Sequence, residues 1–271
     1  MQPGGSGFAR LAGVLLMAMP VTVAAGWRAE VASASRPGPI PLPPSVEVQY
    51  EFGWEKFPAA EAVVTLNYEG SRIVGQGKGK TIGPVRPIWP YQCEVTANVR
   101  AKGLTSVSFR NNERIRKQRR DTKLTYQPEK VTIQRTEKEP GEPLEEKKKW
   151  FQVPSRDLLG AALWFRSQDL KPGKEYRAVV VPGWSPYLVT IRVAERESIW
   201  LGRKEDRQAR AAIRLEVKLQ KIERDDSLTA FEKLKRATVW LSDDALRLPL
   251  RIEADIMVGK VYAEQTLLKT R

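Results

Sequence analysis

Apolar and polar residues alternate with a period of two along much of this chain. The alternation begins at Val46 and continues through Val48, Tyr50, Phe52 and Trp54. It returns over residues 62–68, 189–193, 213–219 and 246–256, the last of which is the longest such run. Strands with one face in the core and one face in water show this pattern, and antiparallel sheets contain many of them. The chain is therefore predicted to be mainly β.

Short connections between these strands are indicated by turn-forming residues. Glu69-Gly70, Asn111-Asn112 and Pro172-Gly173 each stand between strand-like segments. Glycine and asparagine tolerate the positive φ angles that tight turns need. The stretch 137–149, which is charged and contains two prolines and a glycine, is predicted to be a solvated loop.

One helix is predicted, from Arg156 to Phe165, with Ser155 as its N-cap and Asp157 in its first turn. It has almost no polar face, so it should be buried. Gly75, Gly77 and Gly79 would leave one face of a strand without side chains, and this stripe is predicted to receive the helix. We therefore expect about ten strands in one strongly curled antiparallel sheet or open barrel, with one buried helix.

The N-terminus has the features of a cleavable export signal. Arg10 precedes an apolar stretch from Leu11 to Val23, and small residues follow it. We predict a signal peptide over residues 1–25, with cleavage after Ala25 or, as the weaker choice, after Ala34. The apolar stretch is too short to cross a bilayer, which takes about 20 residues. The protein is thus expected in the periplasm or secreted, with no transmembrane helix after signal removal.

The region 26–45 contains five prolines and little apolar periodicity. It is predicted to be a proline-rich tether, and an equally good interpretation is a leader remnant without a role. Residues 46–271 are then predicted to form a single β-rich domain. No repeat of solenoid period divides it.

Composition excludes several classes of chemistry. The chain of 271 residues has no histidine, which excludes Ser-His-Asp and Cys-His nucleophile systems and histidine-ligated metal. Its single cysteine, Cys93, can form neither an internal disulfide nor a multi-cysteine metal site. No cofactor is therefore expected. The formal net charge is +14, which becomes +13 without Arg10 of the signal.

Several short segments carry a resemblance to a known family. They are Val153-Pro154-Ser155-Arg156-Asp157-Leu158-Leu159, Leu163-Trp164-Phe165-Arg166, Asp169-Leu170-Lys171-Pro172-Gly173-Lys174, Val239-Trp240-Leu241-Ser242-Asp243-Asp244 and Arg247-Leu248-Pro249. In their order and spacing they resemble the domain-of-unknown-function family 3108, whose members are exported bacterial proteins. The resemblance implies a β-rich envelope domain and no named catalytic residue.

Two motifs partly resemble functional sites. Residues 75–81 end like a phosphate-binding loop, but Val74 stands where such a loop needs glycine, and Gly83-Pro84 prevents the helix that should follow. Asp243 and Asp244 could act as paired carboxylates, with Arg247 beside them. Their position between two strands favours a turn in which these side chains bond their own backbone.

The densest positive charge lies in one short stretch. It comprises Arg110, Arg114, Arg116, Lys117, Arg119, Arg120 and Lys123, against only Glu113 and Asp121. Export argues against nucleic acid as its partner and favours anionic lipid or glycan. Arg116, Arg119 and Arg120 are the binding candidates here, and a solvated hairpin face is the commoner outcome for such a run.

The sequence predicts a non-catalytic envelope protein that binds an amphiphile or an anionic envelope component. Trp164 and Arg166 are further binding candidates, although tryptophans at such positions are more often core. The alternatives are a glycan hydrolase using carboxylates from Asp243, Asp244 or Asp157, and a structural assembly partner. The sequence does not indicate an oligomeric state.

Overall fold

The computed structural model describes residues 26–271 except 33–35, 42, 56, 203–204, 233 and 258. The predicted signal peptide over residues 1–25 and the alternative cleavage site after Ala34 lie outside the described residues.

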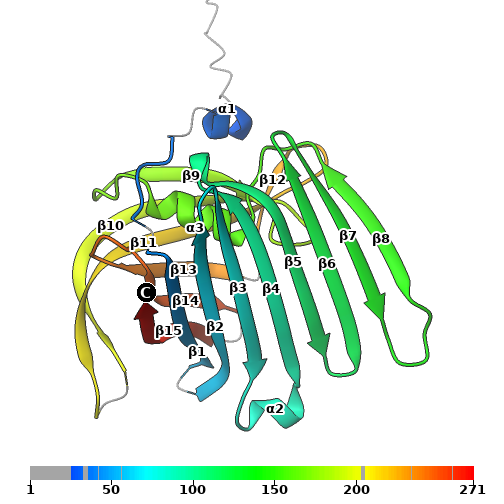
Figure 1. Ribbon diagram of the computed structural model, residues 1–271, viewed down its shortest axis with the longest axis horizontal. Helices are drawn as coiled ribbons and strands as arrows, with labels where there is room; N and C mark the ends of the chain where they lie inside the picture. Colours follow the sequence, from blue (N-terminus) through cyan, green and yellow to red (C-terminus); the bar gives the residue numbers. More distant parts are fainter. Residues whose placement is uncertain are drawn as a thin grey trace, which may run out of the picture.

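The described part of the chain is mostly strand (Figure 1). The strands are β1 (Ser45–Trp54), β2 (Phe57–Glu69), β3 (Arg72–Thr81), β4 (Tyr91–Arg100), β5 (Thr105–Ile115), β6 (Gln118–Gln127), β7 (Lys130–Lys138), β8 (Glu145–Phe151), β9 (Glu175–Val180), β10 (Tyr187–Leu201), β11 (Gln208–Ile222), β12 (Leu228–Ala230), β13 (Leu234–Ser242), β14 (Pro249–Ile256) and β15 (Gly259–Thr270). The helices are α1 (Trp27–Ala32), α2 (Val85–Ile88), the 3-10 turn η1 (Lys102–Leu104) and α3 (Leu158–Arg166). The mainly β prediction is confirmed, with more strands than the ten expected.

All these strands belong to one antiparallel sheet. Its order is β8-β7-β6-β5-β4-β3-β2-β1-β15-β14-β13-β11-β10-β9, and β12 pairs with β11. The first and last strands of the chain meet in the middle, where Val46 of β1 lies opposite Thr270 of β15. Strands β8 and β9 stand at the two ends of this order, so the sheet is not closed.

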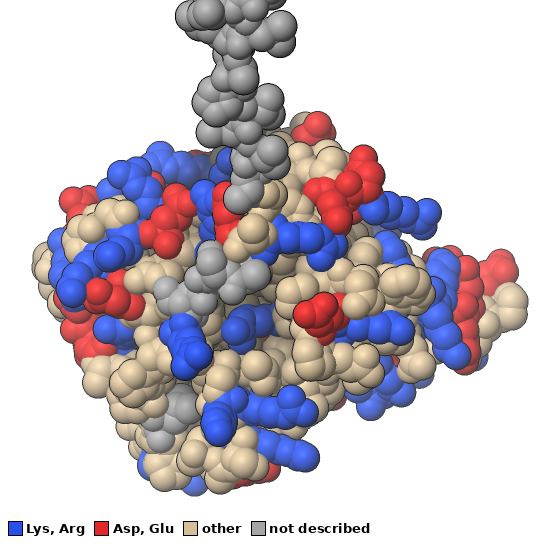
Figure 2. Space-filling model, turned by 90° about the horizontal axis from the view of Figure 1, so that it is seen from above, with Lys and Arg blue, Asp and Glu red and all other residues tan. Residues whose placement is uncertain are grey.

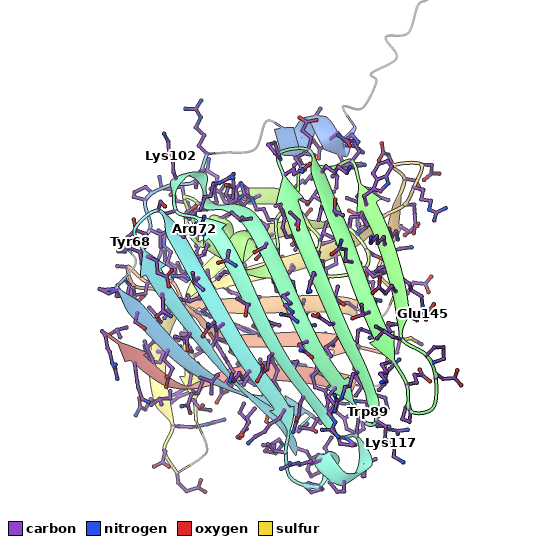
Figure 3. The ribbon with its side chains drawn as sticks, turned by 45° about the vertical axis from the view of Figure 1, so that its right-hand side comes forward. Tyr68, Arg72, Trp89, Lys102, Lys117 and Glu145 are labelled. Carbon is purple, nitrogen blue, oxygen red and sulfur yellow. The ribbon has the colours of Figure 1, made fainter. Side chains whose placement is uncertain are left out.

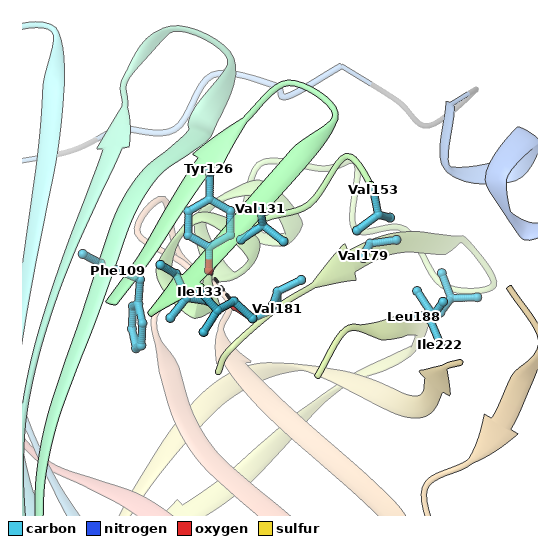
Figure 4. Packing of buried hydrophobic residues seen from close by; sticks show 11 residues of the cluster. Phe109, Tyr126, Val131, Ile133, Val153, Val179, Val181, Leu188 and Ile222 are labelled. Atoms are coloured by element: carbon cyan, nitrogen blue, oxygen red, sulfur yellow. Dashed lines mark hydrogen bonds between the residues drawn. The ribbon is translucent and has the colours of Figure 1, made fainter. Parts of the chain in front are cut away.

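Side chains of the sheet form several buried clusters, and both faces of β9 contribute to them. One cluster joins Phe109, Tyr126 and Ile133, from β5 to β7, to Val179 of β9 and Leu188 of β10 (Figure 4). The Tyr126 hydroxyl donates a hydrogen bond of 2.6 Å to the carbonyl oxygen of Val181, directly after β9. Strands from the two ends of the sheet order therefore pack against each other, and most of their backbone polar groups are paired within the sheet.

Helix α3 is buried, as predicted, but it begins later than the sequence pattern indicates. Asp157, not Ser155, is the N-cap, and its carboxylate accepts a hydrogen bond of 2.9 Å from the Gly160 N–H. Arg156 cannot be helical because its N–H and carbonyl bond to Val179 and Val181 in the manner of a strand. The pairing with β9 therefore delays the helix until Leu158.

The basic hairpin turns at a different place from the one predicted. Asn111 and Asn112 lie inside β5, where they pair with β4 and β6. The turn falls at Arg116, whose φ of 54° lies in the left-handed region. Asparagine tolerates a turn without requiring one, and two neighbouring strands hold these residues extended.

The charged stretch 137–149 is a loop only in its middle. Its first residues end β7 and its last residues form most of β8. Glu137 accepts a bond of 2.6 Å from Arg120 and one of 3.3 Å from Lys147, on the strands at either side. These charged side chains point to the inner face and pair with each other, so the strands lack the apolar alternation that would have revealed them.

The long strand predicted over residues 246–256 begins only at Pro249, as β14. Leu246 and Leu248 belong to the preceding turn, in which Arg247 has a φ of 46°. The longest strands are β10 and β11, with 15 residues each. The alternation of Leu246 and Leu248 therefore reflects burial of a turn against the core, where Leu248 is 3% exposed.

The glycine stripe does lie on one face of β3, but α3 covers only one of its members. A side chain added at Gly75 would collide with Leu159 of α3. At Gly77 it would meet Val95 instead, and at Gly79 it would meet the Cys93 sulfur. The prediction that the helix covers the whole stripe is therefore wrong beyond Gly75, because side chains of β4 fill the space beside the other two.

Replacing Gly75 by leucine should lower the free energy of unfolding by about 1 to 3 kcal/mol, because the new side chain overpacks the contact with Leu159. Urea denaturation would measure the change. Gly183→Leu is the matched control, since a side chain there meets open space, and its effect should stay within about 0.5 kcal/mol. Equal effects of the two substitutions would contradict the contact.

The region 26–45 is not extended throughout. Helix α1 lies within it, and Trp27 and Val31 pack against the cluster around Tyr126. Arg28 forms a salt bridge of 2.7 Å with Asp226 in the turn after β11.

In the described part of the chain, none of the helices has the length and apolar character needed to cross a membrane.

Candidate binding site

Figure 1 shows α1 and β9 at one end of the strands β2–β8, which we call the upper end. A cavity of about 470 Å³ lies there, lined by residues of β4, β9 and the segment before α3. Its charged lining residues are Arg36, Arg100, Arg156 and Arg177, and none of the described residues that line it is an aspartate or glutamate. Its apolar lining includes Val31, Pro37, Pro154, Trp164, Ala178 and Val179. Its volume is within the range of small-molecule sites, about 300 to 1,000 Å³.

Arg156 lies at the centre of this arrangement. It stands between β8 and α3, and its guanidinium lies 5.2 Å from the centre of the Trp164 ring. One of its N–H groups donates to the carbonyl of Leu104 in η1. Burial lowers the pKa of Arg156 to about 10, so the side chain is still charged at neutral pH. A half-buried cation that is held against an aromatic ring and a carbonyl is ready to receive an anion.

The other three arginines come from distant parts of the chain. Arg177 of β9 pairs with Glu30 of α1 and, at 2.6 Å, with Glu175. No salt bridge within the described residues joins Arg36, Arg100 or Arg156 to a carboxylate. Three positive charges around the cavity are thus not neutralised by direct contacts. Figure 2 shows the molecule from this upper end, where many Lys and Arg side chains lie at the surface among those of Asp and Glu.

One polar group in the cavity wall lacks a partner among the described residues. The hydroxyl of Ser155, which lines it, is buried and makes no hydrogen bond with the described residues. Ser106, also in the lining, accepts a bond of 2.8 Å from the Asp157 N–H. The pKa of Asp157 is raised because burial disfavours its charged form. A buried hydroxyl without a partner is costly unless something fills that role.

Trp164 is the sequence candidate that the structure places in this cavity. Only 2% of it is exposed, and it packs edge-on against Phe165 and Tyr176. Arg166 lies at the other end of α3, buried, and donates to the carbonyl of Leu246. Burial lowers the pKa of Arg166 to about 10. Trp164 therefore belongs both to the core and to the cavity wall, whereas Arg166 lies away from it.

Arg247 holds the C-terminal end of α3. One of its nitrogens donates to the carbonyl oxygens of Arg166 at 2.8 Å and Gln168 at 2.7 Å. The Arg166 carbonyl ends the helix and the Gln168 carbonyl follows its C-cap, Ser167. Unpaired acceptors and the negative end of the helix dipole favour a cation at this position. This sequence candidate thus has a structural role in the fold.

Asp243 and Asp244 also act within the fold. Asp243 pairs with Arg196 of β10. Asp244 accepts hydrogen bonds from the Ser242 hydroxyl at 2.8 Å and the Leu246 N–H at 2.9 Å, which is the geometry of a turn. Asp157 caps the opposite end of α3, about 13 Å along the helix axis from Arg166. The structure therefore does not bring Asp157 together with the pair at residues 243–244.

The three arginines of the basic run point to different surroundings. Arg116 lies in the β5–β6 turn, with its guanidinium 4.6 Å from the centre of the Trp89 ring. Arg119 lies on the outer face of the sheet, opposite Arg114. Arg120 points to the inner face and pairs with Glu137. They do not form one basic face.

Sequence reasoning missed the four cavity arginines because they come from four segments with no common motif. Arg36 lies in the proline-rich region, Arg100 at the end of β4 and Arg177 in β9. Arg156 could have been identified as a candidate from the sequence, because it is a charged residue within a segment predicted to be a buried helix. Only the antiparallel order of the strands places these residues around one space.

Comparison with known proteins gives a family and a fold. The model of a family of proteins of unknown function, DUF3108, matches residues 48–266. No curated protein matches the sequence. A β-barrel-like protein of the DUF1849 domain from Brucella abortus has a similar structure, with a TM-score of 0.52 and 8% identity over 84% of this chain and 98% of that chain. A Bacteroides fragilis protein, described as exported and with a YmcC-like fold, covers 87% of this chain and 100% of that chain at 7% identity, with a TM-score of 0.35.

Proposed function

The chain belongs to the DUF3108 family of proteins of unknown function, and from this premise we propose that it is a non-catalytic exported protein that binds an anionic amphiphile in the upper cavity. The headgroup would lie among Arg36, Arg100 and Arg156, and the apolar part along Val31, Pro37 and Pro154. The observation that carries this proposal is a cavity of about 470 Å³ whose lining, in the described part of the chain, contains four arginines and no acidic residue.

The combination of charge and apolar surface selects the class of ligand. Arginine side chains bind carboxylate and phosphate oxygens with two parallel hydrogen bonds. The hydroxyl of Ser155 could supply a further donor to the same headgroup. A small inorganic anion would satisfy these groups but would leave the accessible apolar lining of Val31, Pro37 and Pro154 exposed to water. An amphiphile satisfies both.

The predicted export of the protein agrees with a ligand of this class. The signal over residues 1–25 would deliver the protein to the periplasm or the medium, where anionic lipids and glycans are available. A strongly curled sheet would place β9 and α3 beside β5–β7 and so enclose the site. The carboxylates at residues 157, 243 and 244 already serve the helix cap, a salt bridge and a turn, so nothing in their geometry favours a hydrolase.

The test is a titration with a fluorescent fatty acid, 11-(dansylamino)undecanoic acid, joined to native mass spectrometry of protein purified from its own envelope. The double variant Arg100→Gln/Arg156→Gln should bind the probe about tenfold or more weakly, because each charge-assisted hydrogen bond contributes about 1.5 kcal/mol or more. It should also lose any copurifying amphiphile.

Arg192→Gln/Lys218→Gln is the matched control, since it removes two exposed positive charges of β10 and β11 that do not line the cavity. Its affinity for the probe should equal that of the natural protein. If both double variants bind the probe alike, the cavity is not the site and the proposal fails.

A further inference from the structure

Three connections lie side by side at the end of the sheet opposite the cavity. They are the β1–β2 turn, the β3–β4 connection that contains α2, and the β14–β15 turn (Figure 1). The Glu55 N–H donates to the Lys260 carbonyl at 2.7 Å, which joins the first turn to the third. The Ile82 N–H donates to the Ala59 carbonyl at 2.9 Å, which joins the first to the second. We call these connections, together with the neighbouring β5–β6 turn, the lower surface.

The lower surface carries the most exposed large apolar side chains of the described residues. Ile88 is 73% exposed, Met257 72% and Phe57 70%. Ile88 and Met257 lie on two of the three connections, and Phe57 is the first residue after the β1–β2 turn. Trp54 and Trp89 lie beside them and are about half exposed. Single exposed apolar residues are ordinary, but a group drawn from three adjacent loops indicates an interaction surface.

Basic side chains lie next to this apolar group. Arg86, Arg114 and Arg116 line a cavity of about 230 Å³ beside α2, and its lining includes no acidic residue among those that the structure describes. Arg116 stacks on Trp89, and Lys117 is exposed at the same turn (Figure 3). No salt bridge within the described residues involves any of these four cations. The acidic loop over residues 139–144 belongs to the next hairpin and bounds the surface on that side.

We propose that the lower surface docks on a lipid bilayer that contains anionic lipids. Tryptophan, with an apolar body and a polar N–H, is favoured at the interface between lipid chains and water. Lysine and arginine beside it are attracted to anionic headgroups, and the small arginine cavity is suited to one phosphate group. Ile88, Phe57 and Met257 then enter the acyl boundary, as the apolar face of an interfacial helix does.

This surface is distinct from the upper cavity. Strand β4 runs from Tyr91 beside the lower surface to Arg100 in the cavity, a distance of about 30 Å along the strand. A protein docked in this way would keep the cavity away from the bilayer that it touches. The docking proposal and the ligand proposal can therefore fail separately.

The first test concerns the apolar side chains. Cosedimentation with phosphatidylglycerol vesicles should show binding by the mature chain, with little binding to phosphatidylcholine vesicles. The triple variant Phe57→Ser/Ile88→Ser/Met257→Ser should bind phosphatidylglycerol about tenfold or more weakly, because membrane affinity follows the apolar area buried. Trp150→Ser is the control, since this side chain is 61% exposed but lies on the outer face of β8, and its binding should be unchanged.

The second test concerns charge. Arg86→Gln/Lys117→Gln should weaken binding to the same vesicles by about 25-fold, or fivefold for each basic residue at a membrane surface. Salt should reduce the binding of the natural chain and have less effect on the variant. Arg72→Gln/Lys102→Gln removes two charges from the upper end (Figure 3) and should leave binding unchanged.

Two results would overturn the proposal. One is equal binding by a variant and its control. The other is the absence of vesicle binding by the natural chain, together with a dimer that the triple serine variant converts to monomer in analytical ultracentrifugation, which would identify the surface as a contact between copies. In either case the fatty-acid titration of the Arg100/Arg156 variant still decides the ligand proposal independently.

Discussion

Replacing Trp164 by alanine should lower the free energy of unfolding by about 3 to 5 kcal/mol, the largest effect that we expect from one substitution. Trp164 is 2% exposed and packs against Phe165 and Tyr176 and beneath Arg156. Its removal leaves a cavity in the cluster that joins α3 to β9, β10 and β11. Urea denaturation followed by circular dichroism would measure the loss.

A second variant separates the two roles of this side chain. Trp164→Phe keeps an aromatic ring under Arg156 and should cost clearly less stability than alanine, because a smaller cavity is left. Trp150→Ala, on the outer face of β8, should change stability by no more than about 0.5 kcal/mol. If Trp164→Ala were as mild as Trp150→Ala, Trp164 would not belong to the core.

Replacing Arg247 by alanine should cost about 2 to 3 kcal/mol, because two charge-assisted hydrogen bonds to the end of α3 are lost. The carbonyls of Arg166 and Gln168 would then be buried without this partner. Thermal denaturation would show the loss as a lower Tm.

Glycine at the same position provides the internal control. Residue 247 has a φ of 46°, which glycine adopts more easily than alanine does. Arg247→Gly should therefore be the milder of the two by about 1 kcal/mol, while still less stable than the natural chain. The reverse order would mean that the positive φ does not affect stability here. If neither variant were less stable than the natural chain, the hydrogen bonds of Arg247 would not stabilise the end of α3.

The sequence was informative wherever one face of a strand was apolar. Val46 and Val48 in β1, and Ile213 and Leu215 in β11, were predicted to be strand residues with a buried side, and each is nearly inaccessible. The burial of α3 followed from its lack of a polar face. These are local properties, since a period of two or a wholly apolar helix can be seen within ten residues.

The sequence was uninformative where the structure depends on contacts between residues that lie far apart in the sequence. Strand β8 presents Lys147 to the inner face, where it pairs with Glu137, and no apolar alternation marks it as a strand. The helix start was displaced because Arg156 bonds to β9, more than twenty residues later. The cavity likewise depends on four arginines brought together by strand order, which no single segment records.

The pairing of β1 with β15 has a consequence for the time course of folding. Most strands pair with a neighbour in sequence, so the meander β2–β8 and the meander β9–β14 can each begin to form from nearby residues. They become one sheet only when Val46 meets Thr270, across more than 200 residues. Contacts at such separation are slow to form because a long loop must close before they stabilise anything. We therefore expect β1 and β15 to join late, after the last residues of the chain are available, with the core around α3 completed in the same step.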